Sequence, residues 1–259
     1  MRYDDSFIQA YLQESPLSKE PFYKDIRNYQ KPDIKRKDIV EELNTKLSSI
    51  VNDFPVFNQT LWNMLFSDKE SYLDTICILP VVGSDTMSTR VLRNDETYIL
   101  IDLICVANYT RVVSQMVYIL KNHITFEVTK LCILKQYPLS GENYAHILNA
   151  SAFINGLAHY LSWNESCELY KFYTEKYEPH KEKAFGLLTQ AMTIDNRAMQ
   201  QKIIKHIRSS ELWDQFPAVA GMFYFDDIYR ELGKKGIKQL YAMGPKNFIA
   251  HIFEQESDS

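Results

Sequence analysis

The sequence contains little glycine and little proline, with 8 and 9 residues respectively in a chain of 259. All-β and loop-rich domains use many such residues in their turns, so this scarcity argues against both classes. The hydrophobic share of 46% can build a sizeable core, which argues against a disordered chain. We therefore expect a folded chain with one large domain or two small ones.

Signals for secretion and membrane insertion are also missing. The N-terminal residues MRYDDSF lack the basic stretch and the apolar run of a secretory signal. No run of about 18 apolar residues occurs, so no transmembrane helix is expected. The four cysteines are widely spaced, form no C-x-x-C pair and are typical of reduced thiols in a cytoplasmic protein.

The charge is nearly balanced, with 29 basic and 33 acidic residues and a net charge of −4. This balance gives no general attraction to nucleic acid or to an anionic membrane, and we expect neither as a partner. The chain also lacks a glycine-rich phosphate loop and a G-x-S-x-G motif. These absences argue against a P-loop nucleotide-binding enzyme and against a serine hydrolase.

The first 74 residues favour a helical extension. Apolar residues recur at helical spacing in 1–14 and 36–52, and a helical pair is expected within 57–75. Three prolines between these segments predict that 15–34 is an extended connection.

The remaining sequence predicts an α+β fold that is mainly α. Residues 75–82 and 97–103 are short, β-branched segments that indicate two strands, separated by a turn-rich polar segment. The small sheet would lie beside a helical body, so that 75–254 forms one domain and 255–259 a disordered tail. Helices are expected at 109–136, 143–163, 165–175, 180–193, 196–209, 217–232, 234–243 and 245–254.

The most informative residue of the long predicted helix is Glu127. At 100° per residue, Glu127 falls within the apolar stripe that includes Met116, Leu120 and Ile124. A buried carboxylate is costly unless a partner compensates its charge. Glu127 is therefore either neutralised by Lys130 or open to a wet cleft, or it is a site residue such as a general base.

Three segments resemble parts of zinc peptidases. Residues 124–131 (ITFEVTKL) resemble the helix that carries H-E-x-x-H, in which two histidines bind zinc and the glutamate activates a water molecule. Residues 153–162 (FINGLAHYLS) resemble the E-G-L-A-x-Y segment of gluzincin-type peptidases, whose glutamate is the third zinc ligand. Residues 216–249 resemble the helical tail of predicted bacterial zinc-dependent proteases. The resemblance covers about 75–253 and implies a gluzincin-like fold.

The chain departs from this pattern at all three metal-binding positions. Phe126 and Lys130 stand where the histidines would be, and Asn155 stands at the third ligand. A phenyl ring cannot coordinate zinc, an ammonium repels it and an amide oxygen is a poor ligand. Only Glu127 remains, as a vestigial general base. The resemblance therefore implies a pseudo-metallopeptidase without zinc or another cofactor.

Non-catalytic binding is the function that these residues favour. The Lys130 ammonium would replace the missing metal beside Glu127, and Asn155 would hydrogen-bond to either residue. The former active-site cleft would then bind a peptide or protein partner, as in a regulatory, inhibitory or immunity-type protein. The expected binding residues are Lys130, Asn155, His159, Tyr160 and His123.

Two alternatives stay open at this point. His123, Glu127 and His159 could converge on a metal that is displaced by one helical turn, which would make the chain an active metallopeptidase. Alternatively, side chains could fill the cleft, and the chain would serve only as an interaction scaffold.

Overall fold

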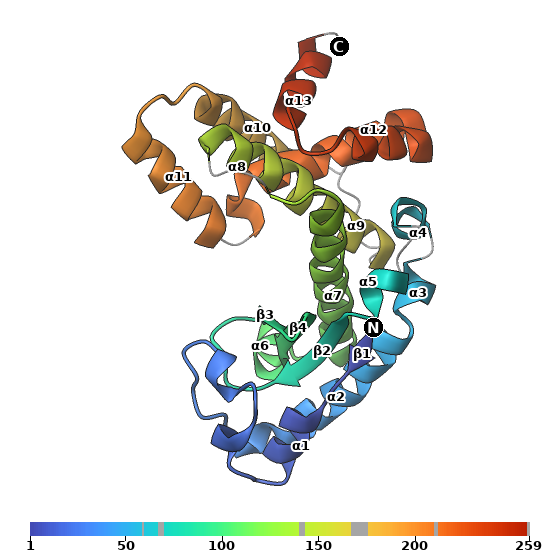
Figure 1. Cartoon of the computed structure of the whole chain (residues 1–259), viewed down its shortest axis with the longest axis vertical. Coiled ribbons are helices and arrows are strands. Elements are labelled where there is room, and N and C mark those ends of the chain that lie inside the picture. The colour runs from blue at the N-terminus through green and yellow to red at the C-terminus, as the bar shows by residue number, and fades with distance from the viewer. Residues whose placement is uncertain (59, 67–69, 140–142, 167–175, 210–211, 258–259) are drawn as a thin grey trace. The chain divides into compact units, whose positions relative to one another are not determined.

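The computed structural model describes residues 1–58, 60–66, 70–139, 143–166, 176–209 and 212–257, and its fold is α+β and mainly helical (Figure 1). The chain forms two compact units, Met1–Gln59 with Phe66–Ile124 and Thr60–Leu65 with Thr125–Ser259. The long helix α7 (Val113–Gln136) contributes to both units. This division does not coincide with the expected boundary at residue 74, because the N-terminal residues take part in the sheet of the first unit.

A four-stranded sheet organises the first unit, in the order β1-β2-β4-β3. The central strand β2 pairs in parallel with β1 and β4, and β3 pairs antiparallel with β4. All six residues of β2 are buried, as is typical of a parallel strand that is covered on both faces. The two predicted strands are confirmed as β2 and β4. The strands are β1 (Arg2–Tyr3), β2 (Ile76–Val81), β3 (Ser88–Arg93) and β4 (Glu96–Asp102).

The N-terminus begins with a strand, so the helix predicted for 1–14 is wrong in its first residues. Arg2 and Tyr3 pair with β2, and the helix α1 (Ser6–Leu12) starts only afterwards. The Tyr3 hydroxyl donates a hydrogen bond of 2.9 Å to the Asn44 carbonyl and so joins the strand to helix α2 (Lys37–Asn52). The segment expected to be a helical extension therefore supplies an edge strand, too short to leave a periodic pattern in the sequence.

Strand β3 lies in the segment that was expected to consist of turns. Its residues STRVLR are mostly half-exposed, because β3 is an edge strand of the sheet. Asn94 and Asp95 connect β3 to β4 and have φ angles of 51° and 63°. Two consecutive residues with positive φ are typical of the two-residue turns that join antiparallel strands.

Helices complete the first unit. Helix α2 confirms the prediction for 36–52. The helix predicted for 109–136 starts later than expected, because Thr110 is extended with φ −156° and separates α6 from α7. The other helices of this unit are α3 (Phe54–Phe57), α5 (Glu70–Leu73) and α6 (Leu103–Tyr109), with 3-10 turns at Leu17–Lys19, Tyr23–Asp25 and Ile34–Arg36.

The second unit consists of helices. The helix predicted for 143–163 is present but contains a π-helical turn at Ser151–Asn155. The predicted helices at 180–193 and 196–209 are confirmed, whereas residues 167–175 of another predicted helix lie outside the described residues. The helices are α4 (Leu61–Leu65), α8 (Tyr144–Ala150), α9 (Gly156–Ser166), α10 (Glu178–Met192), α11 (Arg197–Ser209), α12 (Phe216–Met243) and α13 (Phe248–Ser257).

Two glycines lie at a break and at the end of helix α12. Gly233 has φ 62° and interrupts α12, which agrees with the separate helices predicted for 217–232 and 234–243. Gly244 follows the last residue of α12 with φ 71°, a conformation that glycine adopts at low cost. Helix α13 continues to Ser257 and so extends into the segment expected to be a disordered tail.

The core of the second unit depends on direct contact between backbones. The first eleven residues of α12, up to Asp226, are buried. A Cβ atom on Gly221 would lie 1.9 Å from the carbonyl oxygen of Ala152 in the π-helical turn. A Cβ atom on Gly156 would lie 2.8 Å from the carbonyl carbon of Gly221. Glycine is therefore required on both sides, because any larger residue would push α12 away from α9.

Gly221→Ala is expected to lower the free energy of unfolding by about 2–3 kcal/mol, because an overpacked backbone contact must open. Gly186→Ala is the matched control, since a Cβ atom on Gly186 in α10 would meet no atom within 4 Å. The control should gain up to about 1 kcal/mol from helix propensity. Urea denaturation of both variants measures the difference. Equal stabilities would contradict the close approach.

Candidate functional site

Helix α7 carries four of the residues that the sequence singles out, His123, Phe126, Glu127 and Lys130. Glu127 is buried, with an exposed fraction of 7%, while Phe126 and Lys130 are half-buried. The predicted apolar stripe is confirmed in the first half of the helix, where Met116, Leu120 and Ile124 are buried. In the second half the buried face shifts: Leu131 and Leu134 are only half-buried. Besides Glu127, the buried residues there are Thr125, Val128, Thr129, Cys132 and Ile133.

The ring of Phe126 joins α7 to α9. It stacks on the His159 imidazole with a centroid distance of 4.1 Å and an interplanar angle of 24°. The Lys130 ammonium lies 4.8 Å from the centroid of the same phenyl ring. Stacking and cation–π contacts each contribute about 0.5–1 kcal/mol at such a partly exposed place. The structure thus brings three of the predicted residues together as an aromatic–cation cluster, defined here as Phe126, Lys130 and His159.

Asn155 ends the π-helical turn that precedes α9. Its amide nitrogen donates to the Ser151 hydroxyl at 3.4 Å, within the same turn. Isolated π-helical turns occur frequently at functional sites, because the extra residue re-aims the side chains around it. The pairing of Glu127 with Lys130 and the hydrogen bond from Asn155 to either of them stay predictions.

Tyr160 belongs to the core. Its side chain is fully buried, and its ring lies 6.4 Å, centroid to centroid, from the rings of both Phe225 and Tyr229. A partner could not reach it in this conformation. The Gly-Leu-Ala-x-Tyr segment therefore has a structural explanation at both ends, since Gly156 meets the backbone of α12 and Tyr160 packs against the same helix.

His123 has a specific partner within the first unit. Its Nε2 atom lies 2.7 Å from the Ser88 hydroxyl of β3. Within the described part of the chain, no group of three His, Cys, Asp or Glu side chains is placed to hold a metal ion. The side chains at the three motif positions, a phenyl ring, an ammonium and an amide, do not fit zinc.

Sequence reasoning missed a buried polar contact beside the cluster. The indole nitrogen of Trp62 in α4 donates to the Thr129 hydroxyl at 3.0 Å, and both side chains are fully buried. Thr129 lies between Glu127 and Lys130 along the chain, so this contact fixes the rotation of α7 at the cluster. The sequence signal was the pair of threonines, Thr125 and Thr129, placed one turn apart on α7.

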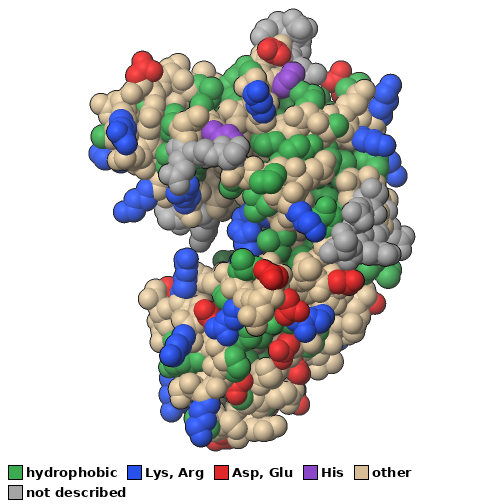
Figure 2. Space-filling view, viewed as in Figure 1, with side chains coloured by type: hydrophobic (Ala, Val, Ile, Leu, Met, Phe, Trp, Pro, Cys, Tyr) green, Lys and Arg blue, Asp and Glu red, His purple; other side chains and the backbone are tan. Residues whose placement is uncertain are grey.

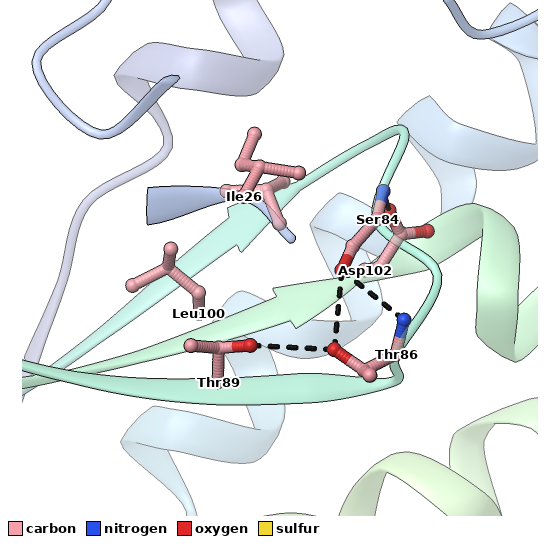
Figure 3. Close-up of a pocket in the computed structure, with 7 residues that line it drawn as sticks. Ile26, Ser84, Thr86, Thr89, Leu100 and Asp102 are labelled. Atoms are coloured by element: carbon pink, nitrogen blue, oxygen red, sulfur yellow. Dashed lines mark hydrogen bonds between the residues drawn. The ribbon is translucent and has the colours of Figure 1, made fainter. Parts of the chain in front are cut away.

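A second polar feature lies in the first unit, where the strands β2 and β4 end (Figure 3). A shallow hollow with no room for a ligand is lined by Ser84, Thr86, Thr89 and Asp102 together with apolar residues. The Thr86 hydroxyl lies 3.2 Å from the Ser84 hydroxyl and 3.3 Å from the Thr89 hydroxyl. The three hydroxyl groups therefore hydrogen-bond to one another and hold the loop between β2 and β3 in place.

Asp102 anchors that loop. Its carboxylate accepts hydrogen bonds from the Ser84 amide at 2.6 Å and the Cys105 amide at 2.7 Å, so it also caps the first turn of α6. Burial raises the pKa of Asp102, and the hydrogen bonds from the backbone oppose this rise. We assign it an architectural role because its accepting oxygens are engaged by the protein itself.

Comparisons with protein-family models, curated proteins and solved structures give no match for the chain. Among the described residues, no helix is both long and apolar enough to cross a membrane.

Asp226 is the buried carboxylate of α12. Burial raises its pKa to about 6, with Arg230 opposing the rise and Asp227 adding to it. The Arg230 guanidinium approaches Asp226 at 3.3 Å, and Lys181 of α10 pairs with Asp227 at 2.8 Å. Because the folded-state pKa exceeds the ordinary value of 3.8, the folded state favours the protonated carboxyl. The resulting stability is present below pH 4 and is lost as the pH rises through 6.

Asp226→Asn is expected to raise the free energy of unfolding at pH 7.5 by about 2 kcal/mol, because the amide avoids the cost of a buried charge. At pH 3.5 the variant and the natural chain should be equally stable. Denaturation at both pH values measures this, with the exposed Asp195→Asn as a control that should change neither value. A loss of stability at pH 7.5 would show that the Arg230 ion pair outweighs burial.

Proposed function

We propose that this chain is a non-catalytic, pseudo-metallopeptidase-like protein that binds a peptide or protein partner through its second unit. One observation carries the proposal: the phenyl ring of Phe126 is stacked on His159 and contacts the ammonium of Lys130. Two of the three positions at which a related peptidase would hold zinc thus take part in a cluster of rings and a cation.

The exposure of the cluster supports binding rather than a filled scaffold. Phe126, Lys130 and His159 are all half-buried, so solvent and a partner can reach part of each side chain. An aromatic ring beside a cation suits a peptide that offers a carboxylate together with an apolar or aromatic side chain. Glu127 is buried, so it is not expected to contact the partner directly.

Regulatory, inhibitory and immunity-type roles all fit this chemistry. The expected location in the cytoplasm belongs to the same proposal, and it is supported by the free thiols of Cys77, Cys105 and Cys132. Cys167, the fourth cysteine, lies outside the described residues.

An active metallopeptidase would need His159 to leave its stack with Phe126 and His123 to leave Ser88. No observation favours these changes. Metal-dependent cleavage of bound peptides would nevertheless reveal such an activity in the experiment that follows.

A selection from a random peptide library with the untagged protein as bait tests the proposal. We expect an enriched peptide motif whose affinity falls about tenfold or more in Phe126→Ala, since a central aromatic anchor commonly contributes about 1–2 kcal/mol or more to binding. The selected peptides should be recovered intact by mass spectrometry after incubation with the protein and zinc.

Phe185→Ala is the matched control. Phe185 is also half-buried, and a lysine one turn away, Lys181, lies 6.0 Å from its ring centroid. Binding should be unchanged in this variant. Equal losses of peptide affinity in both variants would show that the aromatic–cation cluster is not part of the interface. Zinc-dependent cleavage of the peptides would show that the chain is a peptidase rather than a non-catalytic binding protein.

A further inference from the structure

Helix α11 carries an unusual concentration of positive charge. Its sequence RAMQQKIIKHIRS has two arginines, two lysines and one histidine but no acidic residue. The whole chain has 29 basic and 33 acidic residues, so without the four cations of α11 the remaining chain has 25 basic and 33 acidic residues, a net charge of −8. Figure 2 shows basic side chains gathered where α11 lies in Figure 1.

The cations and the apolar residues of α11 lie on different faces. Ile207 is buried, and Ile203 and Ile204 are half-buried on the side of the helix that packs on the second unit, where α8 contacts α11. Arg197, Lys202 and Arg208 are exposed. Among the described residues, none of these three cations forms an ion pair within 4.0 Å. Their charge is therefore directed at solvent or at a partner.

We propose that the exposed face of α11 docks an acidic peptide segment of a partner protein. The helix has 13 residues, which corresponds to a length of about 20 Å at 1.5 Å per residue. A short acidic segment can lie along this length. The attraction acts within a Debye length of about 8 Å at physiological ionic strength, so only groups on or beside α11 contribute strongly.

Other anionic partners fit this face less well. A nucleic acid extends beyond the helix and would meet a remainder with a net charge of −8, and α11 has no Phe, Tyr or Trp residue on which a base could stack. A membrane would require apolar side chains for insertion, but the isoleucines of α11 face the protein.

Two exposed methionines, in α11 and in the helix that precedes it, favour a peptide. Met199 in α11 and Met192 at the end of α10 are 47% and 44% exposed. Methionine side chains adapt to varied apolar partners, so they can receive an apolar residue of a bound acidic segment. This surface uses none of the residues of the aromatic–cation cluster, and it would remain a binding surface if the cluster were not one.

Fluorescence anisotropy with the full chain and a labelled dodecapeptide rich in glutamate, with interspersed leucines, tests this inference. The double variant Lys202→Glu, Arg208→Glu should weaken binding about tenfold or more, because opposite charges across the interface become like charges. The control is Lys234→Glu, Lys238→Glu in α12, which makes the same change in net charge at two other exposed lysines. This control should stay within about twofold of the natural chain. Circular dichroism verifies that both variants are folded.

Three results would overturn the inference. The first is failure of the natural chain to bind the peptide at low ionic strength. The second is equal weakening in both double variants, which would reflect net charge alone. The third is tighter binding of a single-stranded oligonucleotide or of vesicles containing anionic lipid, lost in Lys202→Glu, Arg208→Glu, which would assign the face to a different class of partner.

Discussion

The contact between Gly221 and Ala152 determines the arrangement of the second unit. At this place α12 approaches the π-helical turn so closely that a single methyl group would collide with a carbonyl oxygen. Gly156, which begins α9, meets α12 in the same way. Because backbones rather than flexible side chains touch, the position and rotation of α9 have little freedom, and His159 is held where it can stack on Phe126.

This constraint distinguishes the residues that hold the helices together from those that are available for binding. Gly156 and Tyr160, which suggested a peptidase motif, have structural roles against α12 whatever the chain binds. The positions that would correspond to the metal ligands of that motif carry a phenyl ring, an ammonium and an amide, of which the first two contact each other. Under the proposed function, the scaffold is retained while its former catalytic centre serves as a surface for binding.

Much of the fold could be predicted from the sequence where burial leaves a pattern. Strand β2 is a continuous apolar run and β4 contains the shorter run at residues 98–101, while α2, α10 and α11 have clear helical periods or ends, so the existence of these elements was predicted correctly. Strand β1 has two residues and β3 is a half-exposed edge strand, so neither shows a pattern above that of a polar loop. The π-helical turn was also not predicted, because its sequence, SAFIN, fits an ordinary helix equally well.

The candidate site could be predicted in part. The burial of Glu127 followed from its place among apolar residues of one helix. The stacking of Phe126 on His159 and the bond between Trp62 and Thr129 depend on how separate helices meet, which periodicity within one helix does not determine. The aromatic identity of Phe126 ruled out a ligand, but only the structure identified its neighbour.

The claim that Phe126, Lys130 and Asn155 leave the chain without a zinc site can be tested most directly by isothermal titration of the untagged chain with zinc. Its metal content is then measured. We predict no stoichiometric uptake, with the same result for the natural chain and for His159→Ala. Uptake of one zinc ion per chain that disappears in His159→Ala would contradict it, because His159 would then be a metal ligand rather than the stacking partner of Phe126.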